Sequence, residues 1–306
     1  MTGFLKRRNP IKAFFVASIV LFISFCSVVQ ADTITKEKKQ EVGRYVTELM
    51  NRVGQLGIQT QPYSPRVQEE VLRTKFEQMN RDRWRVYFTN PDDYGRPGAH
   101  GTYKPEYRTP ENFQVWRSRY PYPMAFAYNL ANPNFNASII KTLGCTFLAV
   151  EAPSDLNKEG FYELIGENKL GCLVKLNSPD EYPQETYFPY WHGWSSCNLF
   201  LYNWPHRRGA DPATLLQLVK SVQVSKPQGI IGVSCRAGAG RSGTFIAAYM
   251  IVNEIDRQLK RGVQRENVQV DIDRIIWEIS VQRPFAITHN EQYITLYRLV
   301  DLYLFG

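Results

Sequence analysis

Cys235 and Arg241 lie six positions apart with two glycines between them, and Ser242 follows directly. A cysteine thiolate is a strong nucleophile, and an arginine guanidinium can donate two parallel hydrogen bonds to phosphate oxygens. A serine hydroxyl beside the sulfur can hydrogen-bond it when the sulfur becomes a leaving group. This combination predicts that Cys235 attacks a phosphate group that Arg241 holds, with Ser242 assisting the departure of the sulfur.

The residues between Cys235 and Arg241 are predicted to form a phosphate cradle. An apolar strand runs into this segment and a helix follows it, so backbone N–H groups and the positive end of the helix dipole face one concavity. Glycine permits the backbone angles and the close approach that such a cradle needs. The dipole and the guanidinium should also stabilise the thiolate. The residues expected to bind phosphate are Arg236, Ala237, Gly238, Ala239 and Gly240.

Short apolar runs alternate with helical stretches around this motif. The expected strands are 145–150, 172–176, 199–202 and 230–233. The expected helices are 36–53, one that opens at Ser64-Pro65, 158–167, 212–224, 241–261, 268–282 and 289–304. Strands that alternate with helices predict an α/β fold in which helices cover the faces of a central sheet.

Composition and charge narrow the class of protein. Of 306 residues, 43% are hydrophobic and 22% are charged, which excludes wholesale disorder, collagen and coiled coil. The formal net charge is +8, and it falls to +4 without residues 1–31, which contain four bases and no acid. This mild surplus suits an anionic substrate. No basic run beyond residue 31 indicates a nucleic-acid partner.

The first 31 residues are predicted to be an export signal. Basic Lys6-Arg7-Arg8 precedes an apolar run at 13–29, and Val29-Gln30-Ala31 fits a signal peptidase site, so cleavage is expected after Ala31. The alternative is an uncleaved membrane anchor, because the apolar run is at the lower edge of spanning length. Both interpretations place the domain outside the cytosol, secreted or periplasmic.

Three further cysteines follow the predicted signal, besides Cys235. Cys145, Cys172 and Cys197 are too few for a disulfide scaffold. Each lies in or near an apolar run, which is typical of small buried side chains. An oxidising compartment would allow one disulfide among the three.

The run from Val233 to Phe245 resembles the signature of the protein tyrosine phosphatases. Other stretches follow in the family's order: Asn136-Ala137-Ser138, Glu151-Ala152-Pro153, Tyr190-Trp191, Trp204-Pro205, Gln282-Arg283-Pro284 and Asn290-Glu291-Gln292-Tyr293. The resemblance covers about residues 65–306, which leaves 32–64 as an N-terminal helical extension. It implies a twisted, mainly parallel central sheet flanked by helices. It also implies hydrolysis of phosphomonoesters through a cysteinyl-phosphate intermediate, with neither metal nor other cofactor.

The sequence departs from the family at three positions. Ser234 stands where the family has a histidine that helps to set the thiolate. His206 replaces the aspartate of the mobile acid loop, which is the usual proton donor. Thr288 occupies the position of the glutamine that positions the hydrolytic water, whereas Gln292 matches the family's second glutamine. These departures bear on activation of the nucleophile, on protonation of the leaving group and on the hydrolysis of the intermediate.

Two residues are candidates for the missing acid. An imidazolium at His206 could protonate a leaving oxygen in mildly acidic surroundings. Asp211 has the right chemistry, but Asp211-Pro212 before an apolar run is typical of a helix start, with the aspartate as N-cap. A third interpretation needs no acid, because a phenol is a fairly good leaving group.

The family also uses an aromatic side chain to stack on the phosphotyrosine ring. Tyr120, in Ser118-Arg119-Tyr120, resembles that residue, and Trp84 is the second candidate. Each of the two side chains has packing as its alternative role.

Three functions are consistent with these residues. The first is an exported phosphatase for phosphotyrosine in proteins or peptides. The second is a phosphatase for inositol phosphates or phosphoinositides, which Arg236, Arg207 and Arg208 would help to bind. The third is a catalytically degenerate phosphatase fold that binds phosphorylated ligands. A membrane partner is expected only if the N-terminal segment remains uncleaved.

Overall fold

The computed structural model describes residues 50–88, 130–132, 135–154, 157–177 and 197–306, together with positions 44, 47 and 48. Nearly all of them belong to one compact unit, Val46–Gly306. The predicted signal at 1–31, Tyr120 and Tyr190-Trp191 lie outside the described residues.

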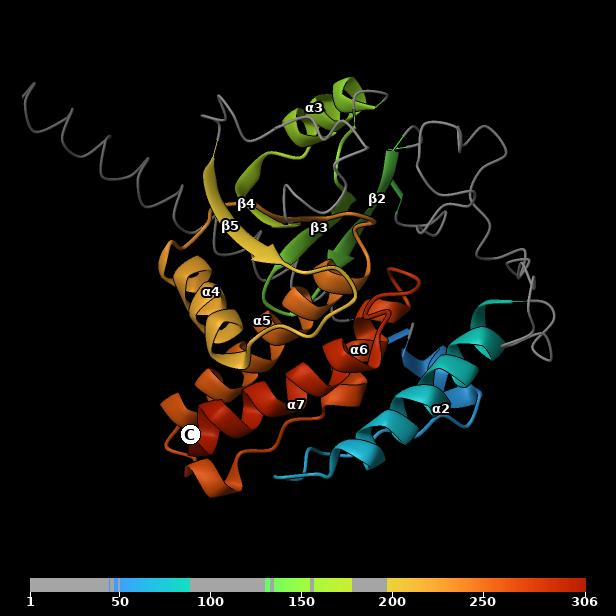
Figure 1. The fold of residues 1–306 in the computed structure, drawn as a ribbon, viewed down its shortest axis with the longest axis vertical. Coiled ribbons are helices and arrows are strands. Elements are labelled where there is room, and N and C mark those ends of the chain that lie inside the picture. The colour runs from blue at the N-terminus through green and yellow to red at the C-terminus, as the bar shows by residue number, and fades with distance from the viewer. Residues whose placement is uncertain are drawn as a thin grey trace, which may run out of the picture. The chain divides into compact units, whose positions relative to one another are not determined.

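A six-stranded sheet forms the centre of this unit (Figure 1). The strand order is β1-β2-β3-β6-β4-β5, and the pairs β3–β6, β6–β4 and β4–β5 are parallel. The edge pairs β1–β2 and β2–β3 are antiparallel. The strands are β1 (Leu130–Asn132), β2 (Phe135–Lys141), β3 (Thr146–Glu151), β4 (Leu170–Asn177), β5 (Asn198–Trp204) and β6 (Ile230–Cys235). The predicted mainly parallel sheet is therefore confirmed.

Helices cover both faces of the sheet (Figure 1). On one face α3 buries Phe161 and Leu164 against the side chains of β2, β3 and β4. On the other face α5 packs on β3 and β6, and α4, α6 and α7 pack around α5. The described helices are α2 (Glu69–Tyr87), α3 (Lys158–Glu167), α4 (Pro212–Val224), α5 (Gly240–Lys260), α6 (Ile272–Ser280) and α7 (Asn290–Phe305), with a 3-10 turn at Arg265–Asn267.

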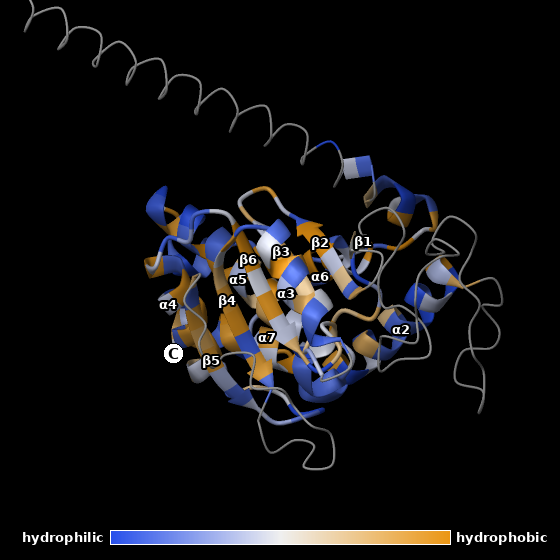
Figure 2. Cartoon of the chain, turned by 90° about the horizontal axis from the view of Figure 1, so that it is seen from above, coloured by the Kyte–Doolittle hydropathy of each residue, from blue (hydrophilic) through white to orange (hydrophobic). Residues whose placement is uncertain are grey.

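The hydrophobic core follows from this layering, as Figure 2 shows by the concentration of apolar residues on the strands and α5. β3 and β6 are buried almost along their whole length, because helices cover both of their faces. Their continuous apolar runs are what a parallel strand buried on both sides requires. None of the described helices is both long and apolar enough to cross a membrane.

The helix predicted to open at Ser64-Pro65 begins later, at Glu69. Arg66 has a left-handed backbone, with φ of 55°, and its N–H donates to Oδ1 of Asp301 on α7. This contact bends the chain and delays the helix. Glu69 and Glu70 then fill the first turn, where negative charge is favoured by the helix dipole.

Candidate active site

Cys235 is the last residue of β6, and α5 begins five residues later at Gly240. Because β6 lies between β3 and β4 and is parallel to both, its carboxyl end opens at the centre of the sheet edge. Cys235 is only 2% exposed. We call residues 236–240 the phosphate loop. Its strand–loop–helix geometry directs the N-terminus of α5 toward the sulfur, as an anion site requires.

Gly238 sets the path of the phosphate loop. Its φ is +64°, and a Cβ at this position would stand 2.4 Å from the carbonyl carbon of Val150. Its N–H donates to the Cys235 carbonyl at 3.2 Å, which closes the turn. Only glycine combines this backbone angle with so close an approach to β3.

Arg283 holds the phosphate loop from behind. It is fully buried, and its guanidinium donates to the Gly238 carbonyl at 2.9 Å, to the Ala237 carbonyl at 2.8 Å and to Ser138 Oγ at 3.1 Å. Arg283 therefore binds two carbonyl groups of the loop and fixes the orientation of their peptide groups. In the sequence, Arg283 is noted only as part of the stretch Gln282-Arg283-Pro284. Its contacts in the structure identify it as a residue that positions the phosphate loop.

Arg241 lies in the first turn of α5 and is 3% exposed. Its Nη1 donates to the Trp204 carbonyl at 2.7 Å and makes a longer contact of 3.5 Å with the Leu176 carbonyl. The carboxyl ends of β4 and β5 thus fix the guanidinium beside the phosphate loop. Ser242 is fully buried, and its hydroxyl donates to the Val233 carbonyl at 3.3 Å. Its bond to the departing sulfur stays a prediction.

A buried carboxylate stands next to the nucleophile on the neighbouring strand. Glu151 is the register partner of Cys235 across β3 and β6, is fully buried and accepts a hydrogen bond from Asn136 Nδ2 at 3.0 Å. Ser234, one residue before Cys235, is also fully buried and pairs with Val150 and Lys175 in the ladder. The position that the family gives to a histidine is thus enclosed by strands on both sides.

The loop at 205–211 carries both acid candidates. Trp204 is fully buried, and its indole N–H donates to the Arg208 carbonyl at 2.9 Å, so the loop folds back over the tryptophan. His206 is half-buried in this loop. Asp211 is the N-cap of α4, as the sequence predicts: its carboxylate accepts from the Thr214 N–H at 2.8 Å and from the Thr214 hydroxyl at 2.7 Å. These bonds lower the pKa of Asp211, which makes it a poor proton donor.

Residues before and within α7 reach the end of the phosphate loop. A Cβ on Gly240 would stand 2.4 Å from Thr288 Oγ1 and 3.0 Å from Gln292 Oε1, so both side chains touch the loop there. Gln292 Oε1 also accepts from the N–H groups of Thr288 at 3.1 Å and His289 at 3.3 Å. The structure therefore brings Gln292 and Thr288 to the predicted site.

His289 is a further imidazole in this region that the sequence analysis missed. Its pKa is lowered by burial and by the positive charges of Arg207, His206 and Arg241. It is therefore neutral at neutral pH and electrostatically coupled both to the phosphate clamp and to the 205–211 loop. A histidine at the start of a helix gives no local signal of such a neighbourhood.

Trp84, one of two candidates for stacking on the substrate ring, lies on α2. Its ring centroid is 4.1 Å from that of Phe88, and the Phe88 ring is in turn 6.0 Å from Phe285. These contacts describe a packing role. The other candidate, Tyr120, is not among the described residues.

The described residues contain no group of three or more His, Cys, Asp or Glu side chains placed to hold a metal ion. Cys145, Cys172 and Cys197 are free thiols in this structure, and burial raises the pKa of Cys172 to about 12. Cys145 and Cys197 are partly buried and Cys172 is buried, and none of the three lies in the strand–loop–helix segment that contains Cys235.

Comparison with known proteins relates this geometry to a family. Residues 195–301 match the family described as protein-tyrosine phosphatase, which covers the C-terminal part of the 65–306 resemblance. The chain is 31% identical over 158 residues to tyrosine-protein phosphatase corkscrew of Drosophila melanogaster, over 48% of this chain and 18% of that protein.

Two receptor-type tyrosine-protein phosphatases are also similar to this chain. Receptor-type tyrosine-protein phosphatase epsilon of Rattus norvegicus is 24% identical over 204 residues, over 52% of this chain and 28% of that protein. Receptor-type tyrosine-protein phosphatase eta of Homo sapiens is 34% identical over 103 residues, over 32% of this chain and 7% of that protein. The chain thus spans less than a third of the length of these curated relatives.

Proposed function

We infer that the chain is a member of the protein-tyrosine phosphatase family and that it hydrolyses phosphotyrosine in proteins or peptides. The observation that carries this proposal is the placement of Cys235 at the end of β6, below the Gly238 turn, with the buried Arg241 guanidinium beside the loop. The family match over 195–301 contains all three residues and supports the same reaction.

The proposed reaction has two steps. The Cys235 thiolate attacks phosphorus, the bond from phosphorus to the tyrosine oxygen breaks, and that oxygen takes a proton. Water then attacks the cysteinyl phosphate, which releases inorganic phosphate and regenerates the thiolate. The phosphate loop and Arg241 bind the phosphate oxygens in both steps, where the charge that develops is stabilised by N–H groups already in place.

A direct test uses the purified full chain. It should hydrolyse an aryl phosphate and phosphotyrosyl peptides, and vanadate, a phosphate analogue, should inhibit both. A preference for inositol phosphates over the peptides would favour the polyanion alternative. Phosphate-analogue binding with no turnover of any ester would favour a binding module and overturn the proposed activity.

We propose His206 as the proton donor, because Asp211, the other candidate in the 205–211 loop, is held ionised as the N-cap of α4. A donor must be protonated, so the rate should fall when a rise in pH removes the donor's proton. His206→Ala should remove this decline and slow alkyl phosphates by about 10²- to 10⁴-fold, and aryl phosphates less. The measurement is the pH–rate profile on both kinds of ester.

Two control variants separate the candidates. Asp211→Asn keeps an N-cap side chain while it deletes the acid, so it should be nearly silent. His289→Gln should leave the alkaline decline in place, because burial and the nearby positive charges lower the pKa of His289 and favour its neutral form, which is a poor proton donor. If Asp211→Asn slows alkyl phosphates strongly and His206→Ala does not, the roles are reversed.

We also propose that the protein is exported. The support is the sequence alone: a basic start, an apolar run at 13–29 and the Val29-Gln30-Ala31 site. Full-length protein made in a secreting host should give a mature form that starts at Asp32, as measured by mass spectrometry. Recovery of an intact 1–31 segment in the membrane fraction would support the uncleaved anchor instead.

A further inference from the structure

A hollow of about 390 Å³ lies between the 205–211 loop and α7. Arg207 and Arg208 line it from the loop, and Glu291, Thr295 and Arg298 line it from α7. We call it the loop–α7 hollow. Its volume is enough for a phosphate or a carboxylate with its water.

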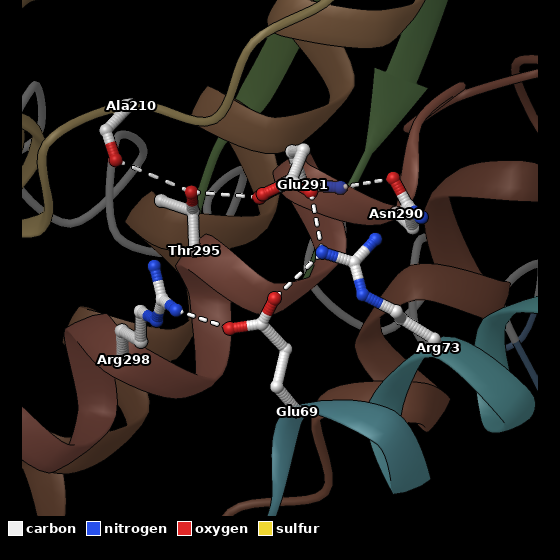
Figure 3. A network of polar contacts seen from close by, with 7 residues as sticks. All are labelled: Glu69, Arg73, Ala210, Asn290, Glu291, Thr295 and Arg298. Carbon is white, nitrogen blue, oxygen red and sulfur yellow. Dashed lines mark hydrogen bonds and ion pairs between the residues drawn. The ribbon is translucent and has the colours of Figure 1, made fainter.

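The Thr295 side chain joins the 205–211 loop to α7 at the wall of the hollow. Thr295 Oγ1 lies 2.8 Å from the Glu291 carbonyl oxygen and 3.2 Å from the Ala210 carbonyl oxygen, so its one hydrogen is shared between these two acceptors (Figure 3). A Cβ on Gly209 would stand 2.7 Å from Thr295 Oγ1, so the loop touches α7 here. The hollow is therefore built from two elements held at a set distance.

The acidic side chains around the hollow are already paired. Glu291 accepts from Arg73 at 2.7 Å, and Arg73 also binds Glu69 at 2.6 Å (Figure 3). Glu69 in turn pairs with Arg298. The remaining acid of the lining, Asp211, is the N-cap of α4. These carboxylates are therefore already bound to other groups and do not neutralise Arg207 or Arg208.

Arg207 and Arg208, in contrast, are exposed and have no side-chain hydrogen bond or ion pair to any described residue. Arg207 also has a left-handed backbone, with φ of 59°. This conformation is uncommon for a residue other than glycine, and it turns the chain between His206 and Arg208. The hollow therefore presents two unpaired guanidinium groups.

The hollow is close to the predicted phosphate site. Trp204 connects them, because its carbonyl accepts from Arg241 at 2.7 Å while its indole donates to the Arg208 carbonyl at 2.9 Å. His289 interacts electrostatically with both Arg207 and Arg241. Trp204 and His289 therefore lie next to both the phosphate clamp and the loop that lines the hollow.

We propose that the loop–α7 hollow binds a second anionic group of the substrate, an acidic side chain or a second phosphate near the phosphotyrosine. The proposal rests on the proposed function. It makes Arg207 and Arg208 specificity-determining residues that recognise the sequence around the hydrolysed phosphate, whereas Arg241 recognises that phosphate itself.

The test compares three phosphotyrosyl peptides of one sequence, with neutral, glutamate or phosphoserine residues beside the phosphotyrosine. The wild-type kcat/KM should be about 3- to 10-fold higher for an acidic peptide, the range expected for one charged contact at a partly exposed site. The double variant Arg207→Gln, Arg208→Gln should bring this ratio toward parity. The glutamate and phosphoserine arms distinguish a carboxylate from a second phosphate as the bound group.

The control is Arg261→Gln, which makes the same type of substitution and removes one positive charge at the opposite end of α5, about 30 Å from the phosphate loop. It should keep the wild-type ratio, because long-range steering is screened at 0.15 M salt. Rates on an aryl phosphate, which has no second anionic group, provide the reference for each variant. Equal rates for all peptides in the wild-type protein, or an equal loss in the control, would overturn the proposal.

A binding measurement keeps this test separate from the proposed activity. In a Cys235→Ser background, fluorescence anisotropy should give the same preference for the acidic peptides and the same loss of preference in the double variant. If the wild-type protein hydrolyses nothing, the proposed function fails. The ratio of affinities for acidic and neutral peptides, measured by anisotropy, still tests whether the hollow binds a second anionic group. The same affinity ratio in the wild-type protein and in the double variant would overturn the proposal that Arg207 and Arg208 bind this group.

Discussion

Replacing Cys235 with serine should abolish turnover while affinity for a phosphate analogue stays close to that of the wild-type protein. A serine hydroxyl is too weak a nucleophile at its ordinary pKa, so the loss should be about 10⁴-fold or more. Binding should survive because the phosphate loop offers backbone N–H groups, which Gly238 and Arg283 position without help from the sulfur. Steady-state kinetics and vanadate titration measure the two quantities.

Cys145→Ser is the matched control for this prediction. Burial raises the pKa of the Cys145 thiol, and Cys145 precedes the start of β3, at the opposite end of that strand from Glu151, the register partner of Cys235. We expect a wild-type rate. Wild-type turnover in Cys235→Ser would remove Cys235 from the mechanism, and a comparable loss in Cys145→Ser would point to general destabilisation instead.

The sequence predicted the elements whose local signals are strong. The helices at 158–167 and 212–224 coincide with α3 and α4, and the predicted run from 230 through 261 contains β6, the phosphate loop and α5. These segments have clear apolar patterns, and α4 also has the Asp211 N-cap followed by proline. β2 was absent from the predicted strands, because its mixed run Phe135–Lys141 alternates neither cleanly nor for long.

The features that the sequence did not predict depend on contacts between residues far apart in the chain. Arg283 meets the phosphate loop 45 residues away and Ser138 145 residues away, so no local pattern could assign its role. The late start of α2 depends in the same way on Asp301, 235 residues from Arg66. His289 is coupled to Arg207 and Arg241 only because α7 begins beside the 205–211 loop. Residue type predicted the chemistry of Cys235 and Arg241, whereas the residues that position them depend on topology.

Arg241→Lys should be the second severe lesion. The guanidinium is buried and its Nη1 is already bound to the Trp204 carbonyl, so the arginine can hold the end of β5 while its other N–H groups face a phosphate. A lysine ammonium is a single point of charge and cannot reproduce this planar fork. Loss of two charge-assisted hydrogen bonds, worth about 1.5–3 kcal/mol each, predicts a fall in kcat/KM of about 10²- to 10⁴-fold.

Both kcat and KM should change in Arg241→Lys, because the clamp acts on the bound ester and on the transition state. Arg257→Lys is the matched control: it makes the same substitution on the same helix, where Arg257 is exposed and pairs with Glu254, and the rate should stay that of the wild type. The thermal unfolding of each variant separates catalysis from folding. An Arg241→Lys protein that kept most of its activity but unfolded at lower temperature would make Arg241 a structural residue that joins α5 to β5.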